Sequence, residues 1–414
     1  PMSRGSAAIA RSSSSRSAKA ERSPFADRLG RLGDSIAQAD LSALLVTNPK
    51  DVGYLTGFLG GDSYLVVPAE AWRSSQKPVL ISDFRYQEEL EPVREAGLAE
   101  IVIRARSMIE SVAEVLGPAP KKGSSDAAPS KLEAAPGPVR PWGGDQRIGI
   151  QAETMPVAER AAIARRVGVK RLVDTTGLIS ALRVIKDESE IALIRKAVRI
   201  QEAALKAVLP TIKPGQTETE IAARLEMEMK SRGSSEPGFE SIVAAGANGS
   251  LPHYRPKNKK TAKGAPLLID WGAVYMGYHS DMTRTFALGK WPKKVEEIFK
   301  VVLEAHDAAA EALAPGKSTK EIDAVARGII EKAGYAEFFG HGLGHGIGLN
   351  AHEDPRLTNM ISGQPLREGM VVTIEPGIYL PGIGGVRIED DYVLTADGSE
   401  NLCSLPRTLE WSTL

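Results

Sequence analysis

One pattern occurs twice in the chain: PGQTETEI at residues 214–221 and PGKSTKEI at residues 315–322. The second copy begins at 315 rather than 214, an offset of 101 residues. In both copies a Thr or Ser precedes a Glu by three residues, which is the spacing of a capping box at the start of a helix. Gly233 and Gly334 share the offset and are expected to end the two helices.

Each copy lies within a longer repeat of helix, helix and sheet. Helical stretches at 187–208 and 295–314 precede the two copies, and strand-rich sequence follows each one. Chance helix capping could explain one motif, but it explains a matched pair with matched glycines less well. We therefore expect a pseudo-symmetric α+β domain over residues 178–414, with its site between the two halves.

Acidic residues interrupt the apolar strands of both halves. Asp270 and Asp281 lie on a predicted hairpin, equidistant from a turn centred at residues 275–276. Glu375 and Glu389 lie symmetrically about a second, glycine-rich turn. Opposed residues of a hairpin project to one face, so each hairpin is expected to present two carboxylates side by side.

Four acids in apolar strands need a physical reason, because burying an unpaired charge costs several kcal/mol. Salt bridges to Arg284 or Arg387, or exposure at strand ends, could explain any single acid. For four acids paired twice, two divalent cations balance the charge directly. The sequence therefore predicts a metal site.

Histidine gives a second signal for metal. All six histidines lie beyond residue 252, and two of them, His341 and His345, lie among five glycines in the segment 340–348. Glycine lets the backbone pass close to a ligand, and His352 follows shortly after. One imidazole with four carboxylates is a ligand set that suits Mn²⁺ or another hard to borderline ion.

Composition excludes several classes of protein. Of the 414 residues, 42% are hydrophobic and 25% are charged, and 52 basic residues balance 52 acidic ones. These values rule out a collagen-like, coiled-coil or wholly disordered chain. The charge balance predicts no nucleic-acid or membrane partner, and the apolar runs fall short of the ~18 residues of a membrane span. Cys403 is the single cysteine, which excludes an internal disulfide. We predict a cytoplasmic protein.

The first part of the chain has a different pattern of predicted helices and strands. Residues 24–177 alternate helical and strand-like pieces, which predicts a smaller α/β domain with a partly parallel sheet and a helix at 84–96. Residues 1–23 are predicted to be a disordered tail and residues 117–145 a flexible insertion. The predicted strands are 43–46, 64–67, 79–81, 101–103 and 148–150.

These motifs resemble the pita-bread metallopeptidases, a family that includes aminopeptidase P, prolidase, methionine aminopeptidase and the metal-free creatinase. The resemblance rests on five positions at the family's spacing and on the strings around them, such as SDMTRTF at 280–286 and TIEPG at 373–377. It covers residues 178–414, and residues 24–177 resemble a creatinase-type N-terminal domain more loosely. The five implied metal ligands are Asp270, Asp281, His345, Glu375 and Glu389.

The resemblance also implies a mechanism. Asp270 would chelate one metal, Asp281 and Glu389 would bridge both, and His345 with Glu375 would complete the second. A hydroxide held between the two ions would attack the carbonyl before proline. Glu375 would also shuttle the proton.

Further residues are implied to contact the substrate. His352 and His253 match two family histidines that stabilise the tetrahedral intermediate, and His341 matches a histidine of the proline pocket. Arg387 and Tyr379 match a pair near the distal end of the substrate. His279 and His306 have no counterpart and are predicted to be structural or surface residues.

The predicted activity is therefore hydrolysis of the Xaa-Pro bond at the N-terminus of peptides, by a homodimer that uses two divalent ions, Mn²⁺ first with Co²⁺ or Zn²⁺ as alternatives. Aminopeptidase P accepts any chain after proline, whereas prolidase accepts dipeptides; the sequence leaves both open, and the aminopeptidase is favoured. Methionine aminopeptidases usually lack the N-terminal domain. A non-catalytic peptide-binding relative is the remaining alternative, although such relatives typically lose the ligands.

Overall fold

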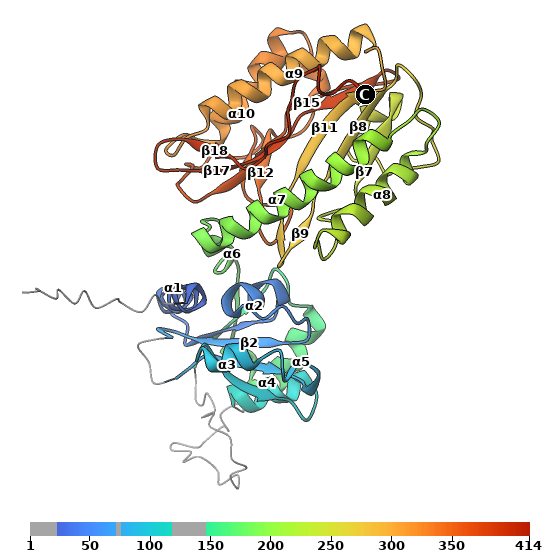
Figure 1. The fold of residues 1–414 in the computed structure, drawn as a ribbon. Coiled ribbons are helices and arrows are strands. Elements are labelled where there is room, and N and C mark those ends of the chain that lie inside the picture. The colour runs from blue at the N-terminus through green and yellow to red at the C-terminus, as the bar shows by residue number, and fades with distance from the viewer. Residues whose placement is uncertain (1–22, 72–75, 118–145) are drawn as a thin grey trace, which may run out of the picture.

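Figure 1 shows a computed structural model of the chain, which describes residues 23–71, 76–117 and 146–414. The predicted tail lies outside these residues except for Ser23, and the predicted insertion lies outside them except for Gly117. The chain forms two parts, a smaller one built on a six-stranded sheet and a larger one built on two pairs of long helices with their sheets.

The sheet of the smaller part is mixed, as predicted. Its order is β4-β3-β2-β1-β5-β6. The β1–β5, β5–β6 and β3–β4 pairs are parallel, whereas β2 is antiparallel to both of its neighbours. The strands are β1 (Ala43–Val46), β2 (Tyr64–Pro68), β3 (Val79–Ser82), β4 (Glu100–Ile103), β5 (Ile148–Gln151) and β6 (Leu172–Thr175). No prediction covered β6.

Helices cover both faces of this sheet. Leu44 and Val46 of β1 pack in one core with α1 and α2, whereas Ala43 and Leu45 pack in another with α4 and α5. This division follows from the alternation of side chains along a strand. The helices are α1 (Pro24–Gln38), α2 (Pro49–Thr56), α3 (Glu91–Glu95), α4 (Met108–Leu116) and α5 (Val157–Val167).

The continuous helix predicted at 84–96 is wrong. A 3₁₀ turn at Phe84–Tyr86 is followed by a turn and then by the short α3. Pro92, near the start of α3, has no backbone N–H to donate and its ring crowds the preceding turn, so a helix cannot run through it unbroken.

The two repeat segments of the larger part begin helices as predicted. The backbone N–H of Thr217 donates to Glu220 at 2.8 Å, and that of Ser318 donates to Glu321 at 2.8 Å. After the helices, Gly233 has a φ of 103° and Gly334 a φ of 83°, the left-handed conformation that ends a helix. The long helices are α7 (Glu188–Val208), α8 (Glu218–Ser231), α9 (Lys293–Ala312) and α10 (Thr319–Lys332).

Each pair of long helices packs on its own sheet. The α7–α8 pair shares a core with the three-stranded sheet β11-β8-β7, and the α9–α10 pair shares a core with strands of the second half. The first-half strands are β7 (Ile242–Ala245), β8 (Pro266–Trp271), β9 (Val274–Tyr275), β10 (Tyr278–His279) and β11 (Met282–Ala287). The second-half strands are β12 (Gly344–Gly346), β13 (Glu353–Leu357), β14 (Val371–Ile374), β15 (Gly377–Leu380), β16 (Gly384–Arg387), β17 (Asp390–Leu394) and β18 (Ser399–Asn401).

A charge cluster joins the two parts. Arg183 of α6 (Ser180–Arg183) donates to Asp51 of α2 at 2.8 Å and also to Glu353 of β13. Lys186 lies 3.4 Å from the same Glu353 carboxylate. Because Asp51, Arg183 and Lys186 are buried, losing one partner would leave an uncompensated charge inside the protein.

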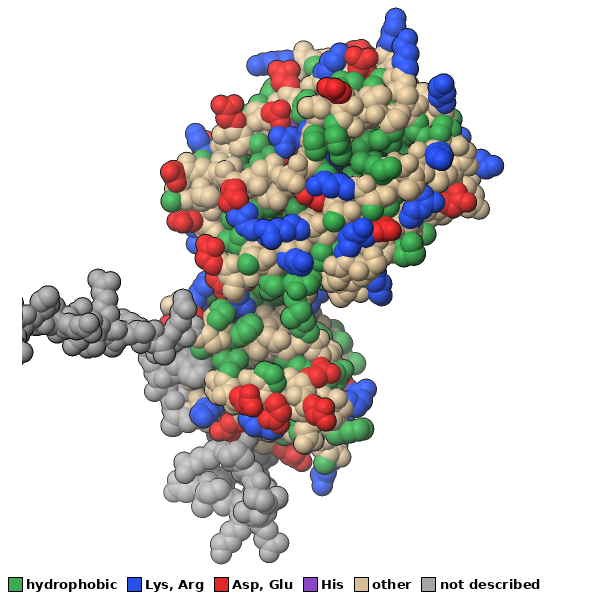
Figure 2. Space-filling view, in the orientation of Figure 1, with side chains coloured by type: hydrophobic (Ala, Val, Ile, Leu, Met, Phe, Trp, Pro, Cys, Tyr) green, Lys and Arg blue, Asp and Glu red, His purple; other side chains and the backbone are tan. Residues whose placement is uncertain are grey.

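Basic and acidic side chains are interspersed over the face shown in Figure 2, in keeping with the balanced composition. Among the described residues, no helix combines the length and the hydrophobicity that crossing a membrane requires.

Candidate metal centre and active site

The first acidic hairpin has a different register from the predicted one. Asp270 pairs with Thr283 rather than with Asp281, because the chain turns at Met276 and Gly277. Both turn residues have positive φ (49° and 83°), as a two-residue type I′ turn requires. Asp281 is displaced by two residues from the predicted pairing, and a shift of two keeps a side chain on the same face. The two carboxylates therefore still reach one cavity.

The second acidic hairpin has the predicted register. The β14–β17 and β15–β16 ladders flank the two glutamates and share one register, which sets Glu375 opposite Glu389. Between the ladders, the N–H of Glu375 donates to the carbonyl of Leu343 at 2.7 Å, and that of Glu389 donates to the carbonyl of Thr283 at 3.1 Å. These bonds tie both glutamates to elements outside the hairpin.

The glycine-rich segment 340–348 contains β12, whose central residue is His345. A Cβ on Gly344 would lie 2.0 Å from the carbonyl oxygen of Thr373 in β14, which no side chain allows. The close neighbour of Gly344 is therefore strand backbone and not the ligand that the sequence suggested. The close approach of Gly344 to Thr373 fixes the position of the next residue, His345, which lines the cavity.

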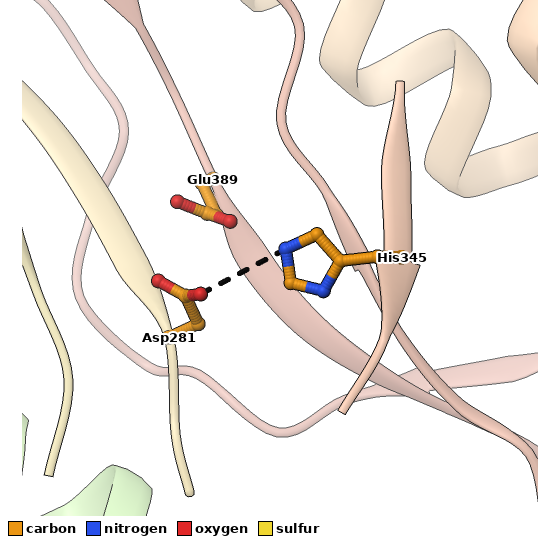
Figure 3. Close-up of side chains that lie close together, drawn as sticks. All are labelled: Asp281, His345 and Glu389. Carbon is orange, nitrogen blue, oxygen red and sulfur yellow. Dashed lines mark ion pairs between the residues drawn. The ribbon is translucent and has the colours of Figure 1, made fainter. Parts of the chain in front are cut away.

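Three predicted ligands lie within reach of one ion. Asp281, His345 and Glu389 each offer a ligand atom, and these atoms lie within 4.8 Å of one another (Figure 3). His345 Nε2 is 3.9 Å from Asp281 Oδ2 and 3.4 Å from Glu375 Oε1. Asp270 lines the same cavity. The structure thus brings the five predicted ligands together.

Burial changes the protonation of this group. It raises the pKa of all four carboxyl groups, and the pKa of Glu389 is raised to about 8, first by burial and then by the neighbouring Asp270. Burial also lowers the pKa of His345 to about 3, so its ring is neutral at pH 7. Crowded carboxyl groups beside a neutral imidazole form a site that a cation would stabilise.

Asp270 shows that the site fits a divalent metal ion. Its Oδ1 is buried and has no hydrogen-bond partner among the described residues, whereas its Oδ2 accepts from Arg387 Nη2 at 2.5 Å. A buried polar atom without a partner costs roughly 1–3 kcal/mol. A cation bound by oxygen ligands and one imidazole would remove that cost, and this ligand set suits an ion such as Mn²⁺.

One cavity of about 670 Å³ collects nearly all the predicted site residues. Tyr379 is the exception, being buried behind the wall. The predicted residues that line the cavity are His253, Asp270, Asp281, His341, His345, His352, Glu375, Arg387 and Glu389.

Tyr379 connects two residues of the wall. Its hydroxyl accepts a hydrogen bond from Arg387 Nη1 at 2.8 Å and lies 2.9 Å from His341 Nε2. Burial lowers the pKa of His341 to about 4, which keeps that ring neutral. Arg387, in the cavity wall, therefore supports Asp270, and Tyr379, behind the wall, supports His341. Their contact with substrate stays a prediction.

The two other cavity histidines differ in their surroundings. His352 packs edge-on against His345, with ring centroids 4.2 Å apart, whereas His253 lies on a loop at the cavity wall, and both residues are exposed. His279 and His306 are buried and neither lines the cavity, which agrees with the structural role predicted for them.

Two supporting residues were missed. Thr283 donates from Oγ1 to Glu389 at 2.7 Å and accepts from Arg387 Nε at 3.0 Å. Asp391 accepts from the backbone N–H of Asp281 at 3.0 Å. Thr283 follows Asp281 by two residues, so the alternation of a strand could have found it. No such sequence pattern points to Asp391, because the residue it bonds to, Asp281, lies in the other hairpin.

Comparison with known proteins identifies the class. Residues 192–396 match metallopeptidase family M24, and residues 28–185 match the creatinase/prolidase N-terminal domain. The chain belongs to metallopeptidase family M24, and the predicted pita-bread fold with its creatinase-type N-terminal domain is confirmed.

Particular relatives resemble it over nearly their whole length. The chain is 34% identical to the uncharacterized peptidase YqhT of Bacillus subtilis, over 92% of this chain and 99% of the relative. A solved Xaa-Pro dipeptidase from Bacillus anthracis superposes with a TM-score of 0.82 at 34% identity, covering 94% of this chain and 100% of that one. An X-Pro aminopeptidase from Thermotoga maritima gives a TM-score of 0.77 at 31% identity, covering 90% and 98%.

Proposed function

We propose that this metallopeptidase hydrolyses Xaa-Pro dipeptides with two divalent ions, Mn²⁺ foremost, held by Asp270, Asp281, His345, Glu375 and Glu389. The sequence favoured the aminopeptidase, but the relatives include Xaa-Pro dipeptidases from Pyrococcus horikoshii and Pyrococcus furiosus at 42% and 44% identity, each over 64% of this chain and 75% of the relative. The dipeptidase is therefore the better-supported choice.

The position of Arg356 in the cavity is the structural observation that favours a dipeptidase. It lies directly opposite His345 in the β12–β13 ladder and lines the cavity. Opposed residues project to one face, so its guanidinium shares the side of the sheet that holds the metal ligands. Among the described residues, no salt bridge involves Arg356, whereas its cavity neighbour Arg255 pairs with Glu240 at 2.9 Å. A dipeptide ends in a carboxylate one residue beyond the scissile bond, and a free guanidinium is suited to bind it.

The chain's own residues would then divide the work. Glu375, whose pKa is raised by burial and by Glu389, is placed to take up a proton and pass it to the leaving amine. His352 and His253 lie at the cavity wall, where their ring N–H groups can donate hydrogen bonds to a developing oxyanion. His341, held by Tyr379, offers a ring edge beside which proline can pack. Bound divalent ions would supply Lewis acidity and lower the pKa of a water nucleophile.

The test compares Ala-Pro with Ala-Pro-Ala in the wild type and in Arg356→Ala. Losing a charge-assisted hydrogen bond costs about 1.5–3 kcal/mol, so kcat/KM for Ala-Pro should fall about 10- to 150-fold. Cleavage of the tripeptide should start low and change little. Arg255→Ala is the matched control, since it removes an arginine of the same cavity that already has a partner. Faster cleavage of the tripeptide by the wild type would favour the aminopeptidase instead.

Two further features stay predictions. A homodimer predicts twice the chain mass by sedimentation or light scattering. Localisation in the cytoplasm can be tested by fractionating cells that produce the protein.

A further inference from the structure

Glu218, the first residue of α8, is a buried carboxylate with four hydrogen-bond donors around it. Its Oε1 accepts from the N–H of Ala245 at 2.7 Å and from Asn248 Nδ2 at 2.8 Å. Its Oε2 accepts from the hydroxyl of Tyr254 at 2.8 Å and from the N–H of Lys257 at 3.1 Å. Because the carboxylate is fully buried, these four bonds at the helix N-terminus compensate for the hydration that it loses.

The donors lie in one continuous segment that runs from Ala245, the last residue of β7, to Lys257, and residues 252–255 of this segment line the cavity. Within the described loop 251–257 there is no helix or strand, and Tyr254 is its one buried residue. His253, directly before Tyr254, is exposed and lines the cavity. The loop is held by the packing of Tyr254 against Ile242 and Leu268, by the exposed Arg255–Glu240 pair, and by the buried bonds that Tyr254 and the backbone of Lys257 make to Glu218.

The start of α8 holds the far end of this loop as well. The N–H of Glu218 donates to the carbonyl of Lys259 at 3.0 Å, and the N–H of Thr219 donates to that of Lys257 at 3.3 Å. These N–H groups have no partner within the helix and are satisfied by the loop instead. The segment 257–259 therefore passes the start of α8 and is bonded to both the side chain and the backbone at Glu218.

The internal repeat shows that a helix start of this kind does not require a carboxylate. The residue 101 positions after Glu218 is Thr319, the first residue of α10. Thr319 also bonds to a loop. Its backbone N–H donates to the carbonyl of Gln364 at 3.0 Å, and its hydroxyl accepts from the N–H of Gln364 at 3.2 Å. At this position of the repeat the second half thus bonds to its loop with a hydroxyl, whereas the first half bonds to the loop that bears His253 with a buried carboxylate.

We propose that Glu218 is a positioning residue, which fixes the loop 251–257 so that His253 faces the reacting centre. The proposal rests on the substrate role proposed for His253. Glu218 touches neither substrate nor metal ligand and acts through Tyr254 and the loop backbone. Small displacements of a group at a reacting centre can cost on the order of 100-fold in rate, so the effect on catalysis should be measurable.

The first experiment is hydrogen–deuterium exchange of residues 245–257 in the full-length protein. Glu218→Gln replaces one acceptor oxygen by an amide that cannot accept from Lys257. Exchange over the loop should quicken by about tenfold, the worth of a hydrogen bond. Tyr254→Phe, which removes one hydroxyl and is a milder change, should quicken it less. Glu202→Gln is the matched control, because Glu202 is a buried carboxylate that accepts from Ser404 and Leu405 away from the cavity.

The second experiment is a double-mutant cycle with His253→Ala, scored as kcat/KM on the best Xaa-Pro substrate. Glu218→Gln alone should lower kcat/KM about 10- to 100-fold, and in the His253→Ala background by less than about threefold, because coupled residues are not additive. Glu202→Gln should have the same small effect in both backgrounds.

The outcomes separate this proposal from the proposed function. Unchanged exchange in both Glu218→Gln and Tyr254→Phe would overturn the positioning role, whatever the enzyme cleaves. Faster exchange with fully additive kinetics would also overturn it, since Glu218 would then order the loop without acting through His253. A wild type that cleaves no Xaa-Pro peptide would overturn the proposed function, and the cycle would then be scored on the peptide it does cleave.

Discussion

Arg387 Nη2 lies 2.5 Å from Asp270 Oδ2, so one predicted metal ligand is also half of a buried ion pair. The same guanidinium donates through Nε to Thr283, whose hydroxyl donates to Glu389. Arg387 thereby orients predicted ligands from two different hairpins. It also supplies a positive charge where four carboxyl groups crowd together.

This ion pair predicts a difference between metal-free and metal-loaded protein. Arg387→Ala leaves Asp270 without its buried partner, which typically costs about 3–5 kcal/mol. Bound cations would replace part of the lost charge, so the variant should lose more free energy of unfolding in a chelator than in saturating Mn²⁺. Denaturant unfolding under both conditions measures this, with Arg255→Ala as control. Equal losses of free energy in both conditions would mean that bound metal ions do not compensate for the lost charge of Arg387.

Metal removal should abolish activity. Elemental analysis should find up to two divalent ions per chain, because two ions balance four carboxylates. A chelator should stop hydrolysis until Mn²⁺ or Co²⁺ is restored. Full turnover by thoroughly metal-free protein would contradict the assignment.

The predicted ligands can be tested singly. His345→Ala and Glu389→Ala each remove a ligand atom from the cluster within 4.8 Å. Activity should fall by about two orders of magnitude or more, since a ligand's loss weakens both metal affinity and orientation. His306→Ala alters a buried histidine that does not line the cavity and should keep its metal content. Near-normal turnover in both ligand variants would place the site elsewhere.

The raised pKa of Glu389 predicts a pH dependence. In the metal-free protein this pKa rises from 4.5 to about 8, so between these values the folded chain holds a proton that the unfolded chain has released. The free energy of unfolding should therefore fall as pH rises across that window. Mn²⁺ must displace the proton, so the Tm gained on adding Mn²⁺ should be larger at about pH 8 than at about pH 6. In chelator, Glu389→Gln should make the free energy of unfolding less dependent on pH. A Tm gain from Mn²⁺ that shrinks with rising pH would contradict the raised pKa of Glu389.

Selectivity for proline should be strong. A secondary amide such as Xaa-Ala brings an N–H that must be desolvated, at ~1–3 kcal/mol, and loses apolar burial of ~0.8 kcal/mol per methylene. Together these terms predict at least ~100-fold preference in kcat/KM. The panel is Gly-Pro, Ala-Pro-Ala, Ala-Ala-Ala, Met-Ala-Ser and acetyl-Ala-Pro-Ala, the last expected to be inert because it lacks a free amine. Faster cleavage of Met-Ala-Ser would indicate a methionine aminopeptidase.

The sequence alone determined the elements whose causes are local. The capping boxes at Thr217 and Ser318 depend on residues three apart, so spacing sufficed to predict both helices. The register of Glu375 and Glu389 followed from one short turn, which leaves little freedom. For Asp270 the same reasoning missed by two residues, because the position of the turn depends on which residues adopt positive φ. Asp270 and Asp281 nevertheless line the same cavity, since a shift of two keeps the face.

Only the tertiary structure decided which distant residues meet. Arg387 and Asp270 are 117 residues apart, and Arg356 faces His345 only through the register of β12 and β13. The carboxylate of Glu218 reads in the sequence as an ordinary first-turn acid of a helix, and its bonds to Tyr254 appear only once the loop is folded over it. Local patterns carry no information on such pairs, because the contact is selected by the packing of whole sheets and the need to satisfy every buried charge.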